Sequence, residues 1–171
     1  MPLSTTIRDI YHPLAEYPHI RDTAILQDAF AVLQGAFSTG KRFRHLLVLD
    51  AHDHLVGVLG IRDLLRGVFP DYLRTGEHSH FAGAQPDVPG LTLIWQETCA
   101  TQCKEAAQKP IKGFMGAVPD TVKLNDPITL AAYFMVIHNT SMLPVVDNSR
   151  VVGVVRVIDV FNEASKAVLH G

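Results

Sequence analysis

The stretch MLPVVDNSRVVGVVRVIDVF at residues 142–161 repeats the pattern of an earlier stretch, HLLVLDAHDHLVGVLGIRDLL, at residues 45–65. Each has an apolar run that ends in Asp, a polar turn, a second apolar run with Gly at its third position, and an Asp that opens an amphipathic segment. The two glycines are 96 residues apart, and so are the two later aspartates, Asp63 and Asp159. This constant offset predicts a duplicated unit of domain size rather than a short solenoid repeat.

Both copies have the same predicted order of elements. The runs at 45–50 and 142–147 are almost continuously apolar, which is typical of strands buried on both faces. The polar residues that follow each run predict a hairpin to a return strand, and the Asp beyond it suits the first turn of a helix. A further helix and a short strand precede each run. The sequence therefore predicts an α+β fold with strand, helix, strand, strand and helix occurring twice, and a ligand crevice between the two units.

Three segments follow from this pattern. Residues 1–69 hold an N-terminal lead-in and the first unit, and residues 111–171 hold the second unit. Residues 70–110 lie between them and contain a loop rich in Pro and Gly, followed by an inserted helix predicted at 91–109. The first unit is also longer at QGAFSTGKRFR (34–44), where three basic residues lie in a helix-to-strand loop.

Composition excludes several classes of protein. The chain has 171 residues, is 47% apolar and carries a net charge of −2. No basic face for nucleic acid is evident, and no apolar run is long enough to span a membrane. The N-terminus lacks the apolar core of a signal peptide. We therefore expect a cytoplasmic protein with reduced thiols that binds neither nucleic acid nor membrane.

Catalytic and metal motifs are not found in the sequence. The nine histidines are scattered, and no nucleophile, base or metal motif emerges, so we expect no enzymatic activity and no required cofactor. Cys99 and Cys103 stand four residues apart, on one face of the predicted helix. We interpret them as small buried residues. A thiol or metal sensor that combines them with His78 and His80 is a minor alternative.

The doubled unit resembles the cystathionine β-synthase (CBS) domain, and the whole chain resembles a stand-alone CBS pair. The resemblance covers roughly residues 7–69 and 111–169 and is carried by the two stretches quoted above, although Leu47 stands where the family has Pro. It implies two units packed with pseudo-two-fold symmetry, and association into a homodimer. It also implies a sensor that binds AMP, ADP, ATP or S-adenosylmethionine in the clefts between units.

The family's ligand motif can be carried over by position. It has Gly, then Ser or Thr three residues on, then an Asp whose carboxylate holds the ribose. The Asp positions here are Asp63 and Asp159, whereas Gly60 and Arg156 replace the hydroxyl residue. Arg156 could contact phosphate, could fill the cleft, or could form a salt bridge on the surface or at a dimer interface. The other candidates lie at the helix starts and along the strands against which family ligands rest: Ile61, Arg62, Val157, Ile20, Thr121, Val122, Leu47 and Pro144.

Two functional hypotheses follow. The paired aspartates favour a regulatory sensor that binds an adenosine-containing ligand and signals to an effector protein. The missing hydroxyl in both copies favours a ligand-free structural or protein-interaction module. For assembly, the closing helix at 157–169 offers an apolar stripe that predicts a homodimer.

Overall fold

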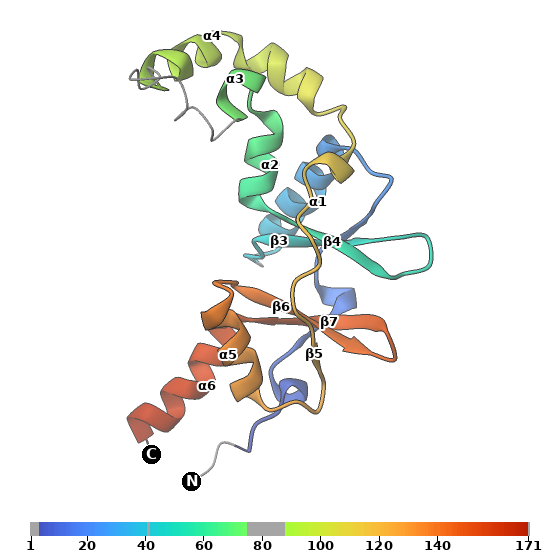
Figure 1. Ribbon diagram of the computed structural model, residues 1–171, viewed down its shortest axis with the longest axis vertical. Helices are drawn as coiled ribbons and strands as arrows, with labels where there is room; N and C mark the ends of the chain where they lie inside the picture. Colours follow the sequence, from blue (N-terminus) through green and yellow to red (C-terminus); the bar gives the residue numbers. More distant parts are fainter. Residues whose placement is uncertain (1–3, 41, 75–87, 171) are drawn as a thin grey trace.

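The computed structural model describes residues 4–40, 42–74 and 88–170, and it confirms the α+β fold with two tandem units (Figure 1). The first unit consists of β2 (His19–Arg21), α1 (Leu26–Ser38), β3 (His45–Leu49), β4 (Leu55–Gly60) and α2 (Ile61–Val68). The second consists of β5 (Val122–Lys123), α5 (Ile128–Ile137), β6 (Met142–Asp147), β7 (Arg150–Arg156) and α6 (Val157–His170). The predicted order of strand, helix, strand, strand and helix is therefore present twice.

The repeat extends to the register of the strands. In the first sheet β2 is parallel to β3, and β3 is antiparallel to β4; β5, β6 and β7 are related in the same way. The register shifts between Val48 and Leu49 in one unit and between Val145 and Val146 in the other. These are matching positions, so both copies have an irregularity at the same place in the hairpin.

The two sheets face one another, and the helices cover their outer faces (Figure 1). Side chains alternate along each strand. In β3, Leu46 and Val48 pack under α1 and α2, while Leu47 and Leu49 join a cluster shared with the second unit. That shared cluster also contains Val154 of β7. Burial on both faces explains why these strands are almost continuously apolar.

The N-terminal lead-in packs on the second unit rather than on its own. It comprises η1 (Ile7–Asp9), β1 (His12–Pro13) and η2 (Leu14–Glu16), and β1 pairs antiparallel with β7. The segment before the second unit mirrors it, because η4 (Ile111–Gly113) precedes Gly116, which bridges to Val58 of β4. Each sheet thus gains an edge contact from the lead-in of the other unit.

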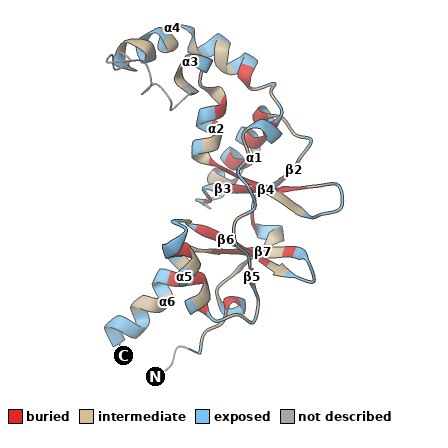
Figure 2. Cartoon of the chain, in the orientation of Figure 1, coloured by how far each residue is buried: buried red, intermediate tan, exposed pale blue. Residues whose placement is uncertain are grey.

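The inserted segment contains α3 (Asp71–Arg74) and α4 (Val88–Ala106). The predicted helix at 91–109 is present but begins and ends three residues earlier. The loop predicted before it is partly wrong, because α3 lies within it; the remaining loop residues, with His78 and His80, lie outside the described ones. The boundaries at residues 69 and 110 stay predictions. Ala106 of α4 is buried, but Leu93 and Ile94 are exposed (Figure 2).

No helix among the described residues is long and apolar enough to cross a membrane. The cytoplasmic location stays a prediction.

Candidate functional site

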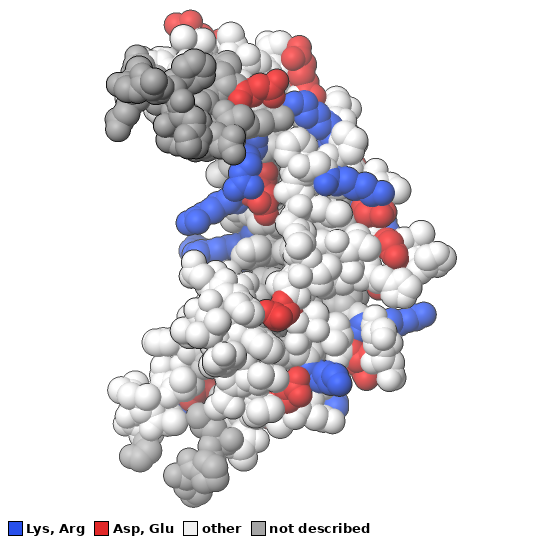
Figure 3. All heavy atoms as spheres, viewed as in Figure 1, with Lys and Arg blue, Asp and Glu red and all other residues white. Residues whose placement is uncertain are grey.

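A cleft of about 430 Å³ lies between the two units. The first unit and its lead-in contribute Tyr17, Arg42, Arg44 and His45, and the second contributes Ser141, Met142, Arg156, Val157 and Ile158. Among the residues that the structure describes, three guanidinium groups and no carboxylate line this space. Figure 3 shows Lys and Arg side chains gathered on the first unit near its boundary with the second. The cleft therefore suits an anionic ligand.

The loop between α1 and β3 positions two of these arginines. Phe43 is 4% exposed and anchors the loop in the cluster between the sheets, while Arg42 and Arg44 on either side of it are exposed. The carbonyl oxygen of Arg44 accepts a hydrogen bond from the N–H of Ile61 at 3.0 Å, which ties the loop to the start of α2. Among the described residues, neither arginine side chain forms a hydrogen bond or ion pair.

Asp63 lies in the first turn of α2, in the first unit. Its carboxylate accepts a hydrogen bond from the backbone N–H of Gly60 at 2.8 Å and one from Arg66 at 3.2 Å. The ion pair with Arg66 is largely exposed, and such pairs contribute little. His45 lies beside Asp63 and Gly60. Burial and the charge of Arg44 lower the pKa of His45 below its ordinary value, although Asp63 opposes them.

Asp159 is the matching residue of the second unit, but its surroundings differ. Its Oδ2 atom accepts hydrogen bonds from the Arg156 backbone N–H at 3.2 Å and from Arg156 Nε at 3.0 Å, and it lies 3.0 Å from His12 Nε2. Its Oδ1 atom accepts from Arg156 Nη2 at 3.0 Å. Burial alone would raise the pKa of Asp159, but Arg156 and His12 together bring it below its ordinary value. Both carboxylate oxygens are thus already hydrogen-bonded within the protein.

The remaining predicted site residues are spread around the cleft. Ile61 and Val157 open α2 and α6, and their N–H groups bond to the carbonyl oxygens of Arg44 and Ser141. Of the twelve predicted residues, Arg156 and Val157 line the cleft. Asp63, Asp159, Gly60 and Ile61 lie at the helix starts described above. The remaining six are buried strand residues (Leu47, Val122 and Pro144), the half-buried Ile20, and the exposed Thr121 and Arg62.

The family model for the CBS domain matches residues 7–69 and 111–166. The chain belongs to the CBS domain family. A comparison with curated protein sequences found no match.

Solved structures of CBS pairs share the fold. CBSX2 from Arabidopsis thaliana superposes with a TM-score of 0.65 at 19% identity, covering 96% of each chain. CBSX2 in complex with AMP gives 0.63 at 20% identity, covering 95% of this chain and 97% of that one. The cytosolic domain of the Mg²⁺ channel MgtE in complex with ATP gives 0.60 at 21% identity, covering 90% of this chain and 46% of that one.

Sequence reasoning missed four residues that matter in this CBS pair. Arg42 and Arg44 were assigned only to a lengthened loop, although basic residues directly before a buried strand are a signal that their side chains lie at a sheet end. His45 follows them in the same stretch. His12 was one of nine scattered histidines, and nothing local in the sequence relates it to Asp159, which lies 147 residues away.

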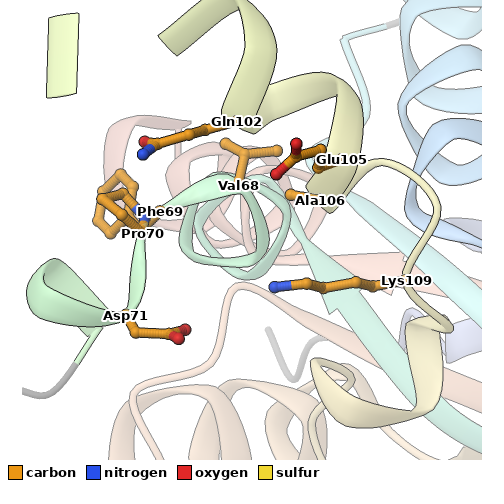
Figure 4. A pocket seen from close by; sticks show the side chains of 8 residues that line it. All are labelled: Val68, Phe69, Pro70, Asp71, Gln102, Glu105, Ala106 and Lys109. Carbon is orange, nitrogen blue, oxygen red and sulfur yellow. The ribbon is translucent and has the colours of Figure 1, made fainter. Parts of the chain in front are cut away.

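A second cavity, of about 310 Å³, lies between α2, α3 and α4, outside the predicted site (Figure 4). Figure 4 shows Asp71 and Lys109 on opposite sides of it.

The cysteines of the minor thiol or metal hypothesis lie on α4. The sulfur atoms of Cys99 and Cys103 are 3.1 Å apart, and both residues are half-buried. Burial and the neighbouring thiol raise the pKa of Cys103 to about 11, which disfavours the reactive thiolate. Within residues 4–40, 42–74 and 88–170, no three His, Cys, Asp or Glu side chains are grouped to hold a metal ion.

Proposed function

We propose that this CBS pair is a regulatory sensor that binds an adenine nucleotide in the cleft between its units. In this proposal Asp63 holds the ribose, and Arg42 and Arg44 attract the phosphates. The observation that carries it is the pair of cleft arginines, Arg42 and Arg44, which form no ion pair among the described residues. They lie near a helix-start aspartate that is bonded within the protein by one backbone N–H and one arginine whose side chain is 58% exposed.

The chemistry of the cleft favours a nucleotide over S-adenosylmethionine. A carboxylate accepts hydrogen bonds from ribose hydroxyls, and guanidinium groups pair well with phosphate oxygens. S-adenosylmethionine carries a positive sulfonium, which the arginines would repel. The AMP and ATP complexes of the structurally similar CBSX2 and MgtE support the same ligand class.

Binding in this cleft would act on both units at once. The first unit lines one wall with Arg42, Arg44 and His45, and Asp63 lies beside His45, whereas the opposite wall belongs to the second unit. A nucleotide that contacts both walls favours one relative placement of the units, and an effector protein that binds that placement reads the nucleotide level. The effector and the cytoplasmic location are parts of this proposal.

We also propose a homodimer built on the outer face of the second unit. Helix α5 has no charged residue, yet Tyr133, Val136 and Ile137 are 58–77% exposed. On α6, Phe161, Val168 and Leu169 are 62–80% exposed. The combined exposed apolar area is on the order of 800 Å², which is what each partner buries in an interface of standard size.

A ligand-free interaction module is the alternative, and the hydrogen-bonded state of Asp159 favours it for one of the two ribose positions.

Isothermal titration calorimetry with AMP, ADP and ATP on the full chain separates the two functions. Asp63→Asn keeps an oxygen for the Gly60 N–H but removes the charge, so we expect affinity to fall by roughly 10- to 150-fold. Asp159→Asn is the matched control and should leave affinity within about threefold of wild type. No binding of any of the three nucleotides at millimolar concentration would favour the interaction module.

A further inference from the structure

Asp159, which matches the ribose-binding position of the family motif, is bonded to the protein's own side chains. Both oxygens of Asp159 are bonded to the guanidinium of Arg156, and one of them also contacts His12. The Asp159 side chain is only 15% exposed. A ribose needs carboxylate lone pairs directed at its two hydroxyl groups. At Asp159, Oδ2 makes three polar contacts and Oδ1 accepts one hydrogen bond from the Arg156 guanidinium. Such charge-assisted hydrogen bonds are about twice as strong as neutral ones, so a ribose would have to displace them.

Asp159 and Phe43 contact the Arg156 guanidinium, and His12 contacts both Asp159 and Phe43. Its guanidinium carbon lies 5.5 Å from the centre of the Phe43 ring, in a cation–π arrangement. The His12 ring meets the edge of the same Phe43 ring at 6.1 Å. Phe43 is buried between the sheets. The lead-in, the loop before β3 and the start of α6 thus converge on one ion pair.

The same positions of the first unit carry glycine. Gly60 matches Arg156, because each lies three residues before the helix-start aspartate. Gly116 matches His12, because Gly116 bridges to Val58 just as His12 pairs with Val154. The Arg156 and His12 side chains therefore close the second position, and two glycines leave the first without such side chains.

We propose that Arg156 and His12 permanently occupy the second ribose position, so that each chain takes one ribose-bearing ligand, at Asp63, while Asp159 works as a clamp on the lead-in. This inference rests on the proposed function for the ligand class. In this inference Arg156 binds Asp159 rather than phosphate. By occupying Asp159 it limits the CBS pair to one ligand per chain.

Calorimetry on the full chain with AMP tests the closure. We expect one site per chain in wild type and two in Arg156→Thr, which installs the hydroxyl that the family has at this position. Adding Asp159→Asn to that variant should return it to one site. Arg66→Thr is the matched control, because it removes the arginine that pairs with Asp63 and should leave one site. Two sites in wild type, or one site in a folded Arg156→Thr variant, would overturn the inference.

Wild-type protein gives a second test that does not depend on the folding of a variant. In an NMR titration with AMP, amide signals of residues 60–63 should shift, whereas those of residues 156–159 should shift much less. Equal shifts at both positions would overturn the inference. If wild type binds no AMP, the proposed function fails. The closure would still be supported if Arg156→Thr binds AMP and the added Asp159→Asn substitution abolishes that binding. If Arg156→Thr also binds no AMP, the closure is overturned.

Discussion

Asp63 and Asp159 occupy the same position in two copies of one unit, but their surroundings differ. Each opens a closing helix and accepts a hydrogen bond from the backbone N–H three residues earlier, at 2.8 Å in the first unit and 3.2 Å in the second. This shared bond is structural, since it satisfies a donor at the helix start. The difference lies in the side chains at the two neighbouring positions, which are glycines in one copy and Arg156 and His12 in the other. The duplication gives two copies of the same backbone arrangement, and in our proposal Arg156 and His12 decide which copy can accept a ligand.

The segment before each unit pairs with the sheet of the other unit, and these two contacts differ in how closely the backbones approach. We expect this difference to have the largest effect on stability. A Cβ atom at Gly153 would lie 2.2 Å from the carbonyl oxygen of His12, whereas at Gly57 it would meet the flexible Met115 side chain at 2.8 Å and the Gly116 carbonyl oxygen at 2.9 Å. We expect Gly153→Ala to lower the free energy of unfolding by about 3 kcal/mol, and Gly57→Ala by less. Urea denaturation measures both.

Gly35→Ala in α1 is the control for this comparison. No atom lies within 4 Å of the added methyl group, so the variant should be about 0.5–1 kcal/mol more stable than wild type. Equal losses at Gly57 and Gly153 would show that the two contacts are equally tight.

The outer helices offer a second contrast, in assembly. Val136 of α5 is 77% exposed, and the matching position of α1 is the polar Gln34. Val136→Asp places a charge in the proposed dimer face, and we expect the dimer dissociation constant to rise at least about 30-fold, equivalent to roughly 2 kcal/mol. Gln34→Asp should leave it unchanged. Sedimentation at several concentrations measures both, and a monomeric wild type at micromolar concentration would exclude this dimer.

The sequence was sufficient for the repeated fold, because that fold depends on local patterns. Two apolar runs, a polar turn and a helix-start aspartate recur in the same order, and each pattern corresponds to an observed element. The strand at His12–Pro13 was not predictable in this way. It has two residues, and it forms only because the lead-in reaches β7, more than 140 residues along the chain.

The site was predicted only in part for the same reason. Asp63, Asp159 and Arg156 follow from the motif, but the ion pair between the last two depends on rotamers and on His12. The arginines at 42 and 44 belong to no motif. Their side chains face the cleft because Phe43 between them is buried, and this alternation could have been read from the stretch KRFRHLL. From the sequence alone, the role of Arg156 stayed open. The structure shows that its guanidinium is bonded to Asp159.

Arg44 tests whether the open position takes its phosphates from the first unit. Its side chain lines the cleft, and its backbone oxygen alone anchors Ile61. Arg44→Ala should therefore leave the fold intact and weaken ATP binding by about tenfold, as expected for one charge-assisted contact. Adenosine, which lacks phosphate, should bind the variant and wild type alike. Equal losses for ATP and adenosine would place the phosphates elsewhere.

The smallest expected effect is a change in proton binding when the ligand binds. It should arise in the first unit alone, because the titratable His45 begins β3 whereas Met142 begins β6 at the matching position. The pKa of His45 is lowered by burial, so the imidazole is neutral at pH 7 in the free protein. A phosphate nearby favours the charged form and raises this pKa. Binding should therefore take up a fraction of a proton at pH values between the lowered His45 pKa of the free protein and the higher pKa of the complex. Affinity should rise about threefold as pH falls from 7.5 toward the lowered pKa of the free protein, then level off.

The nucleotide's own phosphate also titrates near pH 6 and releases protons when it binds cations. The informative quantity is therefore the difference between wild type and His45→Gln. We would measure calorimetric heats in two buffers of different ionisation enthalpy and obtain the number of protons exchanged by each protein. Greater proton uptake by wild type than by His45→Gln supports a phosphate beside His45. Equal values would mean that the ligand's charge lies away from the first unit, and the assignment of the open position to Asp63 would then lose its support.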